Sequence, residues 1–129
     1  DSSQSDSIPV IVGGDMNSPS HLDWSEKTKK IHNNLVVPWY ATKVFEDMGY
    51  TDSFREKNPN PLKKPGITWD NKTRNDSNRI DYIFYKGRNL KAIKSDSYMA
   101  FFNEQLKIND KKITYPSDHG IVVTEFKLK

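Results

Sequence analysis

The stretch VIVGGDMN, residues 10–17, joins a short apolar run to a polar corner. The β-branched residues between Ile8 and Val12 are typical of a strand that is buried on both faces. We expect the two glycines that follow to release the backbone into an irregular turn. Asp15 and Asn17 would then stand at the carboxyl end of a strand, where a rigid scaffold can hold polar groups that reach solvent.

Two later segments carry groups of the same kind. Asp81 lies within the strand-like run RIDYIFY, residues 79–85, where a buried carboxylate needs a partner such as a histidine or an arginine. Asp118 and His119 stand directly before another strand-like run, and His119 is the histidine available in a similar setting. If these corners meet, they provide the groups for metal-assisted attack of water on a phosphate ester.

Each motif taken alone also has a structural explanation. Asp15 could form an Asx turn with its own backbone, and Ser117 with Asp118 could merely shape a turn. A lone histidine beside a glycine is more often structural than catalytic, and we interpret His21 and His32 as ordinary loop or helix residues.

The remaining sequence predicts one helix and a sheet. Residues 38–48 begin with a proline, carry an apolar stripe at helical spacing and precede Gly49, which suits a left-handed stop. A short helical turn is expected within residues 20–31 and a loop over residues 58–66, which hold three prolines. Strands are predicted over residues 79–85, 90–99 and 121–127, in an antiparallel or mixed sheet.

Composition limits the possible functions. The 129 residues correspond to one domain. Hydrophobic residues make up 34% of the chain and charged residues 29%, and this small share of hydrophobic residues indicates a modest core. No apolar run is long enough to cross a membrane. Because cysteine is absent, a metal must be held by oxygen and imidazole ligands, which favours Mg²⁺, Mn²⁺ or Ca²⁺. The net charge of +3 comes with lysines in short groups rather than a stripe, so charge alone does not indicate a DNA-binding protein.

Four phrases together carry a more specific signal: residues 10–20 (VIVGGDMNSPS), 68–69 (TW), 79–84 (RIDYIF) and 117–122 (SDHGIV). In this order and rough spacing they resemble the endonuclease/exonuclease/phosphatase superfamily, which includes DNase I, abasic-site endonucleases, inositol polyphosphate 5-phosphatases and neutral sphingomyelinases. The resemblance implies an α+β chain forming the carboxyl-terminal half of a DNase I-like four-layer α/β sandwich. This half would hold one mostly antiparallel sheet with one or two flanking helices.

The resemblance also implies a role for each matching residue. Asp15 would orient or deprotonate the attacking water, and Asn17 would donate a hydrogen bond to the phosphorane. Asp118 would bind Mg²⁺ or Mn²⁺ or lie close to it. His119 would contact the scissile phosphate as an imidazolium, held by Asp81.

Two further residues are candidates for substrate binding. Trp69 occupies a place where such enzymes commonly carry an aromatic side chain beside the site, although a Trp that caps the core is an equal alternative. Arg79 could pair with phosphate or with a neighbouring carboxylate, and the sequence does not choose between them.

The chain departs from the family in what precedes the first motif. These enzymes place a metal-binding Glu, an Asn and a further His upstream, whereas no Glu precedes Asp15 here. We therefore expect residues 8–129 to be the carboxyl-terminal half of the domain, after a disordered lead of residues 1–7. The exposed sheet face would be covered by the missing amino-terminal half or by a second copy. Hydrolysis by such a fragment alone is expected to be weak or absent.

Three functions follow as alternatives. The favoured one is a metal-dependent phosphoesterase, whose substrate could be nucleic acid, a lipid headgroup, or an inositol or sugar phosphate, with a slight preference for a small or lipid-like ester. The second is a non-catalytic binding or assembly module that keeps the fold without the complete metal site. The third is an adhesion or carbohydrate-binding domain, in which Asp15, Asp81, Asp118 and His119 do not converge.

The sequence does not identify the cellular compartment. The chain contains neither a cysteine nor a signal peptide, and secreted and periplasmic locations are both compatible with it.

Overall fold

The computed structural model describes residues 8–71 and 76–129. The expected disordered lead, residues 1–7, lies outside the described residues. In chain order the elements are β1 (Val10–Asp15), the 3₁₀ helix η1 (Lys29–Ile31), α2 (Tyr40–Asp47), β2 (Thr51–Asp52), α3 (Ser53–Lys57), β3 (Trp69–Asn71), β4 (Asp76–Asn78), β5 (Asp81–Lys86), β6 (Leu90–Tyr98), β7 (Gln105–Ile108), β8 (Lys111–Thr114) and β9 (Ile121–Leu128). Among the described helices, none combines the length and the apolar character needed to span a membrane.

Every strand pairing between these elements is antiparallel. The strands form a three-stranded sheet in the order β1-β5-β2 and three two-stranded pairs, β3–β4, β6–β9 and β7–β8. The α+β class and the antiparallel arrangement are therefore confirmed. The single sheet we expected is divided into four hydrogen-bonded groups within the described residues, and the four-layer sandwich stays a prediction.

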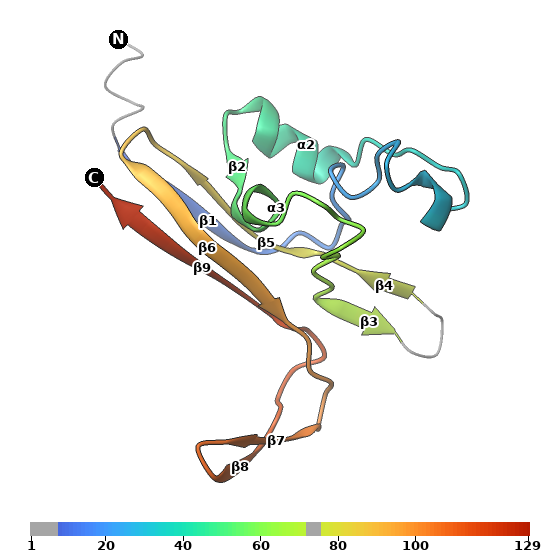
Figure 1. Cartoon of the computed structure of the whole chain (residues 1–129), viewed down its shortest axis with the longest axis vertical. Coiled ribbons are helices and arrows are strands. Elements are labelled where there is room, and N and C mark those ends of the chain that lie inside the picture. The colour runs from blue at the N-terminus through green and yellow to red at the C-terminus, as the bar shows by residue number, and fades with distance from the viewer. Residues whose placement is uncertain (1–7, 72–75) are drawn as a thin grey trace.

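Short helix α3 connects the two largest groups of strands. The Ser53 hydroxyl donates to the carbonyl of Ile83 in β5 at 2.8 Å and lies 2.7 Å from the Thr124 hydroxyl in β9. The rings of Tyr85 and Phe126 meet edge to face, with centroids 5.1 Å apart. In Figure 1 the β6–β9 pair runs alongside β1 and β5, while the β7–β8 hairpin extends away from the other elements.

Strand β1 differs from the sequence prediction at its carboxyl end. Both glycines after Val12 lie in the strand, and the β1–β5 ladder continues until Asp15 stands opposite Asp81. The Met16 N–H extends this ladder by donating to the Ile80 carbonyl at 2.9 Å. The irregular turn therefore begins after Asp15, because pairing with β5 holds the glycines extended.

The predicted helix and loops are found with altered limits. Helix α2 begins at Tyr40 rather than Pro38, and Gly49 adopts the expected left-handed conformation with φ of +84°. Residues 20–31 form turns and the single 3₁₀ helix η1, while residues 58–66 contain no helix or strand, as predicted. The sequence prediction missed α3 and the β2, β3–β4 and β7–β8 strands, which are short and polar.

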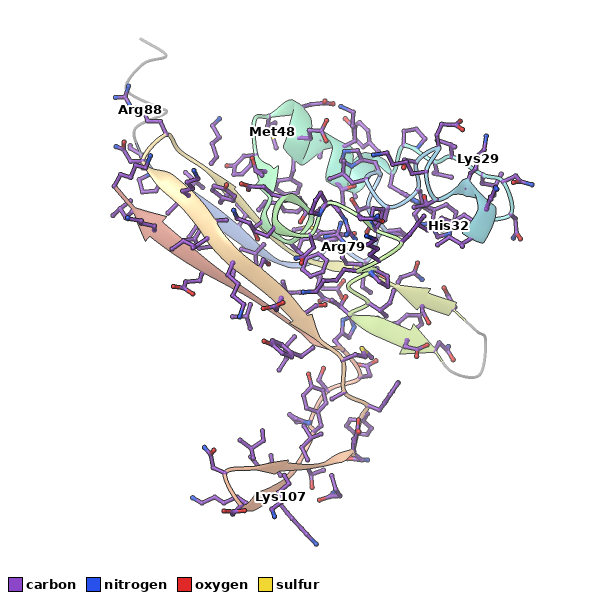
Figure 2. All side chains as sticks on the ribbon, in the orientation of Figure 1. Lys29, His32, Met48, Arg79, Arg88 and Lys107 are labelled. Carbon is purple, nitrogen blue, oxygen red and sulfur yellow. The ribbon has the colours of Figure 1, made fainter. Side chains whose placement is uncertain are left out.

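A buried network of ion pairs connects the loop that contains Asp23 with α3, with β2 and with Arg79, which precedes β5. The carboxylate of Asp23 accepts from Arg55 at 2.8 Å and from Arg79 at 2.7 Å, and Asp52 accepts from Arg79 at 2.7 Å. Burial alone lowers the pKa of an arginine, but the carboxylates of Asp52 and Asp23 outweigh burial and raise the pKa of Arg79. Figure 2 shows the Arg79 side chain inside the molecule, whereas Arg88 and Lys107 lie at its periphery.

Candidate active site

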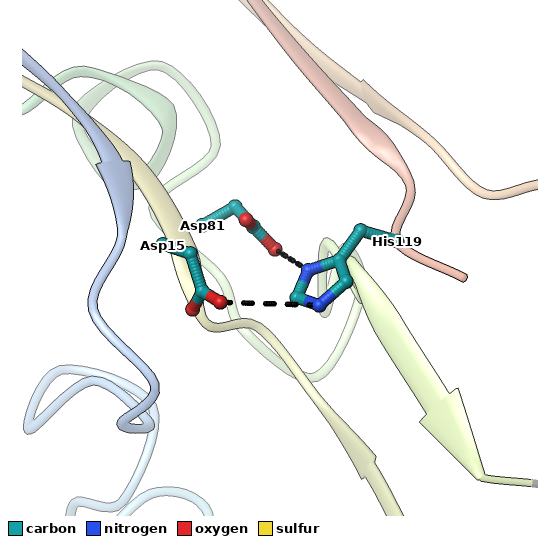
Figure 3. Close-up of side chains that lie close together, drawn as sticks. All are labelled: Asp15, Asp81 and His119. Carbon is teal, nitrogen blue, oxygen red and sulfur yellow. Dashed lines mark hydrogen bonds and ion pairs between the residues drawn. The ribbon is translucent and has the colours of Figure 1, made fainter. Parts of the chain in front are cut away.

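Three side chains from distant parts of the chain meet at one end of the β1–β5 ladder (Figure 3). The ring nitrogen Nδ1 of His119 lies 2.8 Å from Oδ2 of Asp81, and Nε2 of the same ring lies 3.9 Å from Oδ2 of Asp15. One potential ligand atom from each of the three residues lies within 4.8 Å of the other two. The convergence expected from the sequence is present for these three residues.

Backbone pairing brings the three residues together. The antiparallel register places Asp15 directly across from Asp81. His119 reaches the same place because it forms an isolated antiparallel bridge with Trp69, at the start of β3. The next residue, Gly120, donates its N–H to the carbonyl of Thr68 at 2.5 Å. The site is thus positioned by backbone pairing on both sides, through the β1–β5 ladder and through the bridge between His119 and Trp69.

The carboxylates change the proton affinity of the imidazole. The hydrogen bond with Asp81 raises the pKa of His119, the charges of Asp15 and Asp118 add to the effect, and partial burial opposes it. The side chains of His119 and Asp81 are 25% and 21% exposed, so solvent screens their attraction only in part. Asp81 therefore favours the imidazolium form of His119. In this form the Nδ1 proton is hydrogen-bonded to Asp81, and the Nε2 proton can be donated to another group.

The corner after β1 serves two purposes at once. The Asn17 N–H donates to Oδ1 of Asp15 at 2.7 Å, which is the Asx-turn interaction that the sequence offered as a structural alternative. The other carboxylate oxygen, Oδ2, is the one that faces His119. Asn17 has φ of +47°, a left-handed conformation that asparagine tolerates, and its side chain is exposed. The structural and functional interpretations of this motif are therefore compatible.

The second corner also combines a turn with a charged group. The His119 N–H donates to the Ser117 hydroxyl at 3.0 Å, so Ser117 shapes the turn as the structural alternative supposed. Asp118 is exposed and lies near enough to contribute to the raised pKa of His119. Within the described residues, the cluster of side chains that could hold a metal contains Asp15, Asp81 and His119 but not Asp118. A metal-binding role for Asp118 stays a prediction.

The two expected substrate-binding residues differ in position. Trp69 is half-buried and its backbone pairs with that of His119, so it stands next to the site. Arg79 is only 3% exposed, and its guanidinium pairs with Asp23 and Asp52. Of the two kinds of partner that the sequence allowed for Arg79, the neighbouring carboxylate is therefore the one observed. Contact of Arg79 with a phosphate stays a prediction, which its burial does not favour.

Sequence reasoning overlooked three residues around the site. Thr68, Tyr82 and Tyr115 are buried and hydrogen-bond to backbone groups next to the candidate catalytic residues. The Tyr82 hydroxyl, for example, lies 2.7 Å from the carbonyl of Ser18, just after the first corner. Thr68 belongs to the same two-residue motif as Trp69. The sequence signal for Thr68 is its place directly before the motif residue Trp69, whereas its burial is known only from the structure.

The donor atoms suit a hard cation in part. Carboxylate oxygens are the ligands that Mg²⁺ and Mn²⁺ prefer, and Asp15 offers one on a side chain that is 44% exposed. The His119 imidazole is less suitable, because its Nδ1 is engaged by Asp81 and a protonated ring cannot bind a cation. The described residues thus offer carboxylate oxygens of the kind that a hard divalent cation prefers, whereas one nitrogen of the His119 ring is already engaged by Asp81.

Comparison with known proteins agrees with this geometry. The family model described as the endonuclease/exonuclease/phosphatase family matches residues 1–119. An uncharacterized protein of Caenorhabditis elegans is 40% identical to this chain over a region that covers 92% of this chain and 41% of that protein. The chain therefore spans less than half the length of this relative. No solved structure was found to match. The matched region includes every phrase of the resemblance up to His119, and the chain belongs to the endonuclease/exonuclease/phosphatase family.

Proposed function

We propose that this chain supplies catalytic residues to a metal-dependent phosphoesterase that hydrolyses a phosphate ester with an activated water. The observation that supports this proposal best is the meeting of Asp15, Asp81 and His119 at one strand end. An adhesion domain has no need for a carboxylate–imidazole couple between two strands, and the family consists of phosphoesterases and nucleases. The substrate class, the metal dependence and the individual roles are parts of the proposal.

Asp15 is the candidate base. Its Oδ1 is engaged by the Asn17 N–H, which fixes the carboxylate, while the side chain remains 44% exposed. A fixed and accessible carboxylate can accept a proton from water or orient it for attack. Asn17, which is also exposed, would donate from its neutral amide to the negative charge that grows on the phosphate oxygens.

His119 is the candidate donor to the phosphate. Asp81 holds its Nδ1 at 2.8 Å and favours the charged ring, so Nε2 carries the second proton. An imidazolium fixed in this way stabilises a phosphate dianion or the leaving oxygen without reorganising during the reaction. Asp81 acts through His119 and is a positioning residue in this scheme.

The proposed cofactor is Mg²⁺, or Mn²⁺ in its place. When bound, such an ion neutralises phosphate charge and stabilises the leaving oxygen. Asp118 and Asp15 are the residues of this chain that would hold it through carboxylate oxygens. Three such oxygens or fewer leave at least half of the positions around an octahedral ion to water, substrate or residues elsewhere in the protein.

We further propose that this chain forms the carboxyl-terminal half of its catalytic domain. Apolar side chains on the outer strands stay exposed, including Ile11 (52%), Ile121 (47%) and Val123 (51%). Exposed apolar side chains of this kind are suited to packing against the amino-terminal half of a domain or against a second copy. The isolated chain would then hydrolyse phosphate esters weakly or not at all.

The test is a panel of phosphate esters assayed on the full-length protein that contains this chain. Suitable probes are bis-(p-nitrophenyl) phosphate, p-nitrophenyl phosphate, plasmid DNA and sphingomyelin vesicles, each with Mg²⁺, with Mn²⁺ and with EDTA. We expect turnover with a divalent cation, loss with EDTA, and a decrease on the order of 100-fold or more in Asp15→Asn and His119→Gln.

Matched controls come from the same chain. Asp47→Asn changes an exposed carboxylate on α2, and His21→Gln changes a histidine that bonds to Thr42 and Glu46 away from the site. Both variants should keep wild-type turnover. Turnover by the Asp15→Asn and His119→Gln variants at the level of these controls would exclude the proposed chemistry. Binding of a phosphate ester without any turnover would favour the binding-module alternative.

A further inference from the structure

Thr68 is buried between the two segments that carry the carboxylate–imidazole couple, and its side chain is 0% exposed. Its hydroxyl oxygen accepts hydrogen bonds from the N–H groups of Ile80 at 3.0 Å and Asp81 at 3.2 Å. Its carbonyl accepts from the N–H of Gly120 at 2.5 Å. One residue thus contacts the backbone of Asp81 and the backbone directly after His119.

Tyr115 holds the other side of the same histidine. Its hydroxyl donates to the carbonyl of His119 at 2.8 Å, and the residue is only 8% exposed. The peptide group between His119 and Gly120 is therefore fixed at its oxygen by Tyr115 and at its nitrogen by Thr68. Asp81 and His119 are 38 residues apart in the chain, so their 2.8 Å contact depends on such long-range contacts.

We infer that Thr68 is a positioning residue, and Tyr115 its partner, for the Asp81–His119 couple of the candidate active site. The inference rests on the proposed function for its catalytic consequence, but its structural part concerns the couple alone. Neither hydroxyl touches the atoms that would react. Each acts by fixing the backbone from which a reacting group or its holder extends.

The hydroxyl oxygen of Thr68 is the essential atom in this argument. Valine has nearly the same shape, but it offers no acceptor, so Thr68→Val would remove the partner of the buried Ile80 N–H and of the partly buried Asp81 N–H. The start of β5 would shift to satisfy them, and Asp81 would move relative to the ring. Serine keeps the acceptor, so Thr68→Ser should preserve the couple.

A matched control separates positioning from general packing. Thr28 is 1% exposed, and its hydroxyl bonds to backbone groups in the loop over residues 23–28, remote from His119 in the chain. Thr28→Val therefore removes an equally buried hydroxyl by the same substitution. It is expected to reduce stability in the same range while leaving the couple unchanged.

The test compares Thr68→Val, Thr68→Ser, Tyr115→Phe and Thr28→Val in the full-length protein. The first measurement is the NMR signal of the His119 Nδ1 proton, which a hydrogen bond to a carboxylate shifts far downfield, recorded at one acidic pH in EDTA. We expect Thr68→Val and Tyr115→Phe to move this signal upfield or broaden it beyond detection. Thr68→Ser and Thr28→Val should retain it.

The second measurement is the separation of kcat from KM on the phosphate ester that the protein hydrolyses. Misplacing a catalytic group by about 1 Å costs up to about 100-fold in rate, so we expect a 10- to 100-fold lower kcat in Thr68→Val with KM little changed. A folded Thr68→Val with the wild-type proton signal and wild-type kcat would overturn the inference. If Thr68→Val does not fold, an unchanged signal in Tyr115→Phe would overturn it equally.

The two measurements also distinguish this inference from the proposed function. A displaced proton signal in Thr68→Val, in a protein that hydrolyses none of the probes, would support the positioning role and refute the phosphoesterase.

Discussion

Asp15 lies directly opposite Asp81 in the antiparallel β1–β5 ladder, so two carboxylates occupy facing positions at one strand end. Like charges in facing positions destabilise a sheet. His119 offsets this repulsion, because its ring places one nitrogen 2.8 Å from Asp81 and the other 3.9 Å from Asp15. The two neighbouring carboxylates favour a positive charge between them, and the imidazolium of His119 supplies part of it.

The raised pKa of His119 predicts a pH dependence of stability. An imidazole titrates near pH 6.5 in the unfolded chain. Because the folded pKa is higher, the stabilisation is fully present below about pH 6.5 and is lost as the pH rises through the folded pKa of His119. Urea unfolding between pH 5.5 and 9 in EDTA should show this decrease. His119→Gln should abolish that part of the profile, and an identical profile in this variant would assign the dependence to other groups.

Asp15 should matter more for activity than for stability. Asp15→Asn keeps an oxygen that can accept from the Asn17 N–H, so we expect its free energy of unfolding to change by less than about 0.5 kcal/mol. Asp15→Ala removes this acceptor and should cost about 0.5–1.5 kcal/mol. Denaturant titration of the two variants measures the difference. Equal losses would show that the Asx-turn interaction contributes nothing to the fold.

The buried network around Arg79 should dominate the stability of the loop region. Arg79→Met leaves the carboxylates of Asp23 and Asp52 without this cation, and we expect a loss of about 3–5 kcal/mol. Lys43→Met removes an exposed pair with Asp47 on α2 and should change the unfolding free energy by less than about 0.5 kcal/mol. Comparable melting temperatures for the two variants would contradict the structural role assigned to Arg79.

Two glycines provide a matched pair for a test of packing. Gly66 has φ of +71°, and a Cβ atom there would lie 2.3 Å from the Phe54 ring, whereas a Cβ atom at Gly14 meets nothing within 4 Å. We expect Gly66→Ala to destabilise the protein by about 1–3 kcal/mol and Gly14→Ala to have little effect. Thermal unfolding of both variants checks this contrast. A Gly66→Ala variant as stable as Gly14→Ala would mean that the loop does not lie on Phe54.

Local features that depend on neighbouring residues can be predicted from the sequence. The apolar run before Asp15, the helix ended by Gly49 and the later strands follow from hydrophobic pattern and turn chemistry. The motif residues Asp15, Asp81 and His119 were identified because their side-chain chemistry is unusual at strand ends. The four quoted phrases also indicated the family, which the comparison shows.

How these residues meet depends on contacts between segments that are distant in the chain. The β1–β5 register is a long-range pairing, and it kept both glycines extended and placed Asp15 against Asp81. The direction of Arg79 depended on Asp23 and Asp52, which lie 56 and 27 residues away in the chain. Thr68 acquired its position for the same reason, because burial and hydrogen-bond partners are set by contacts between segments that no local pattern records.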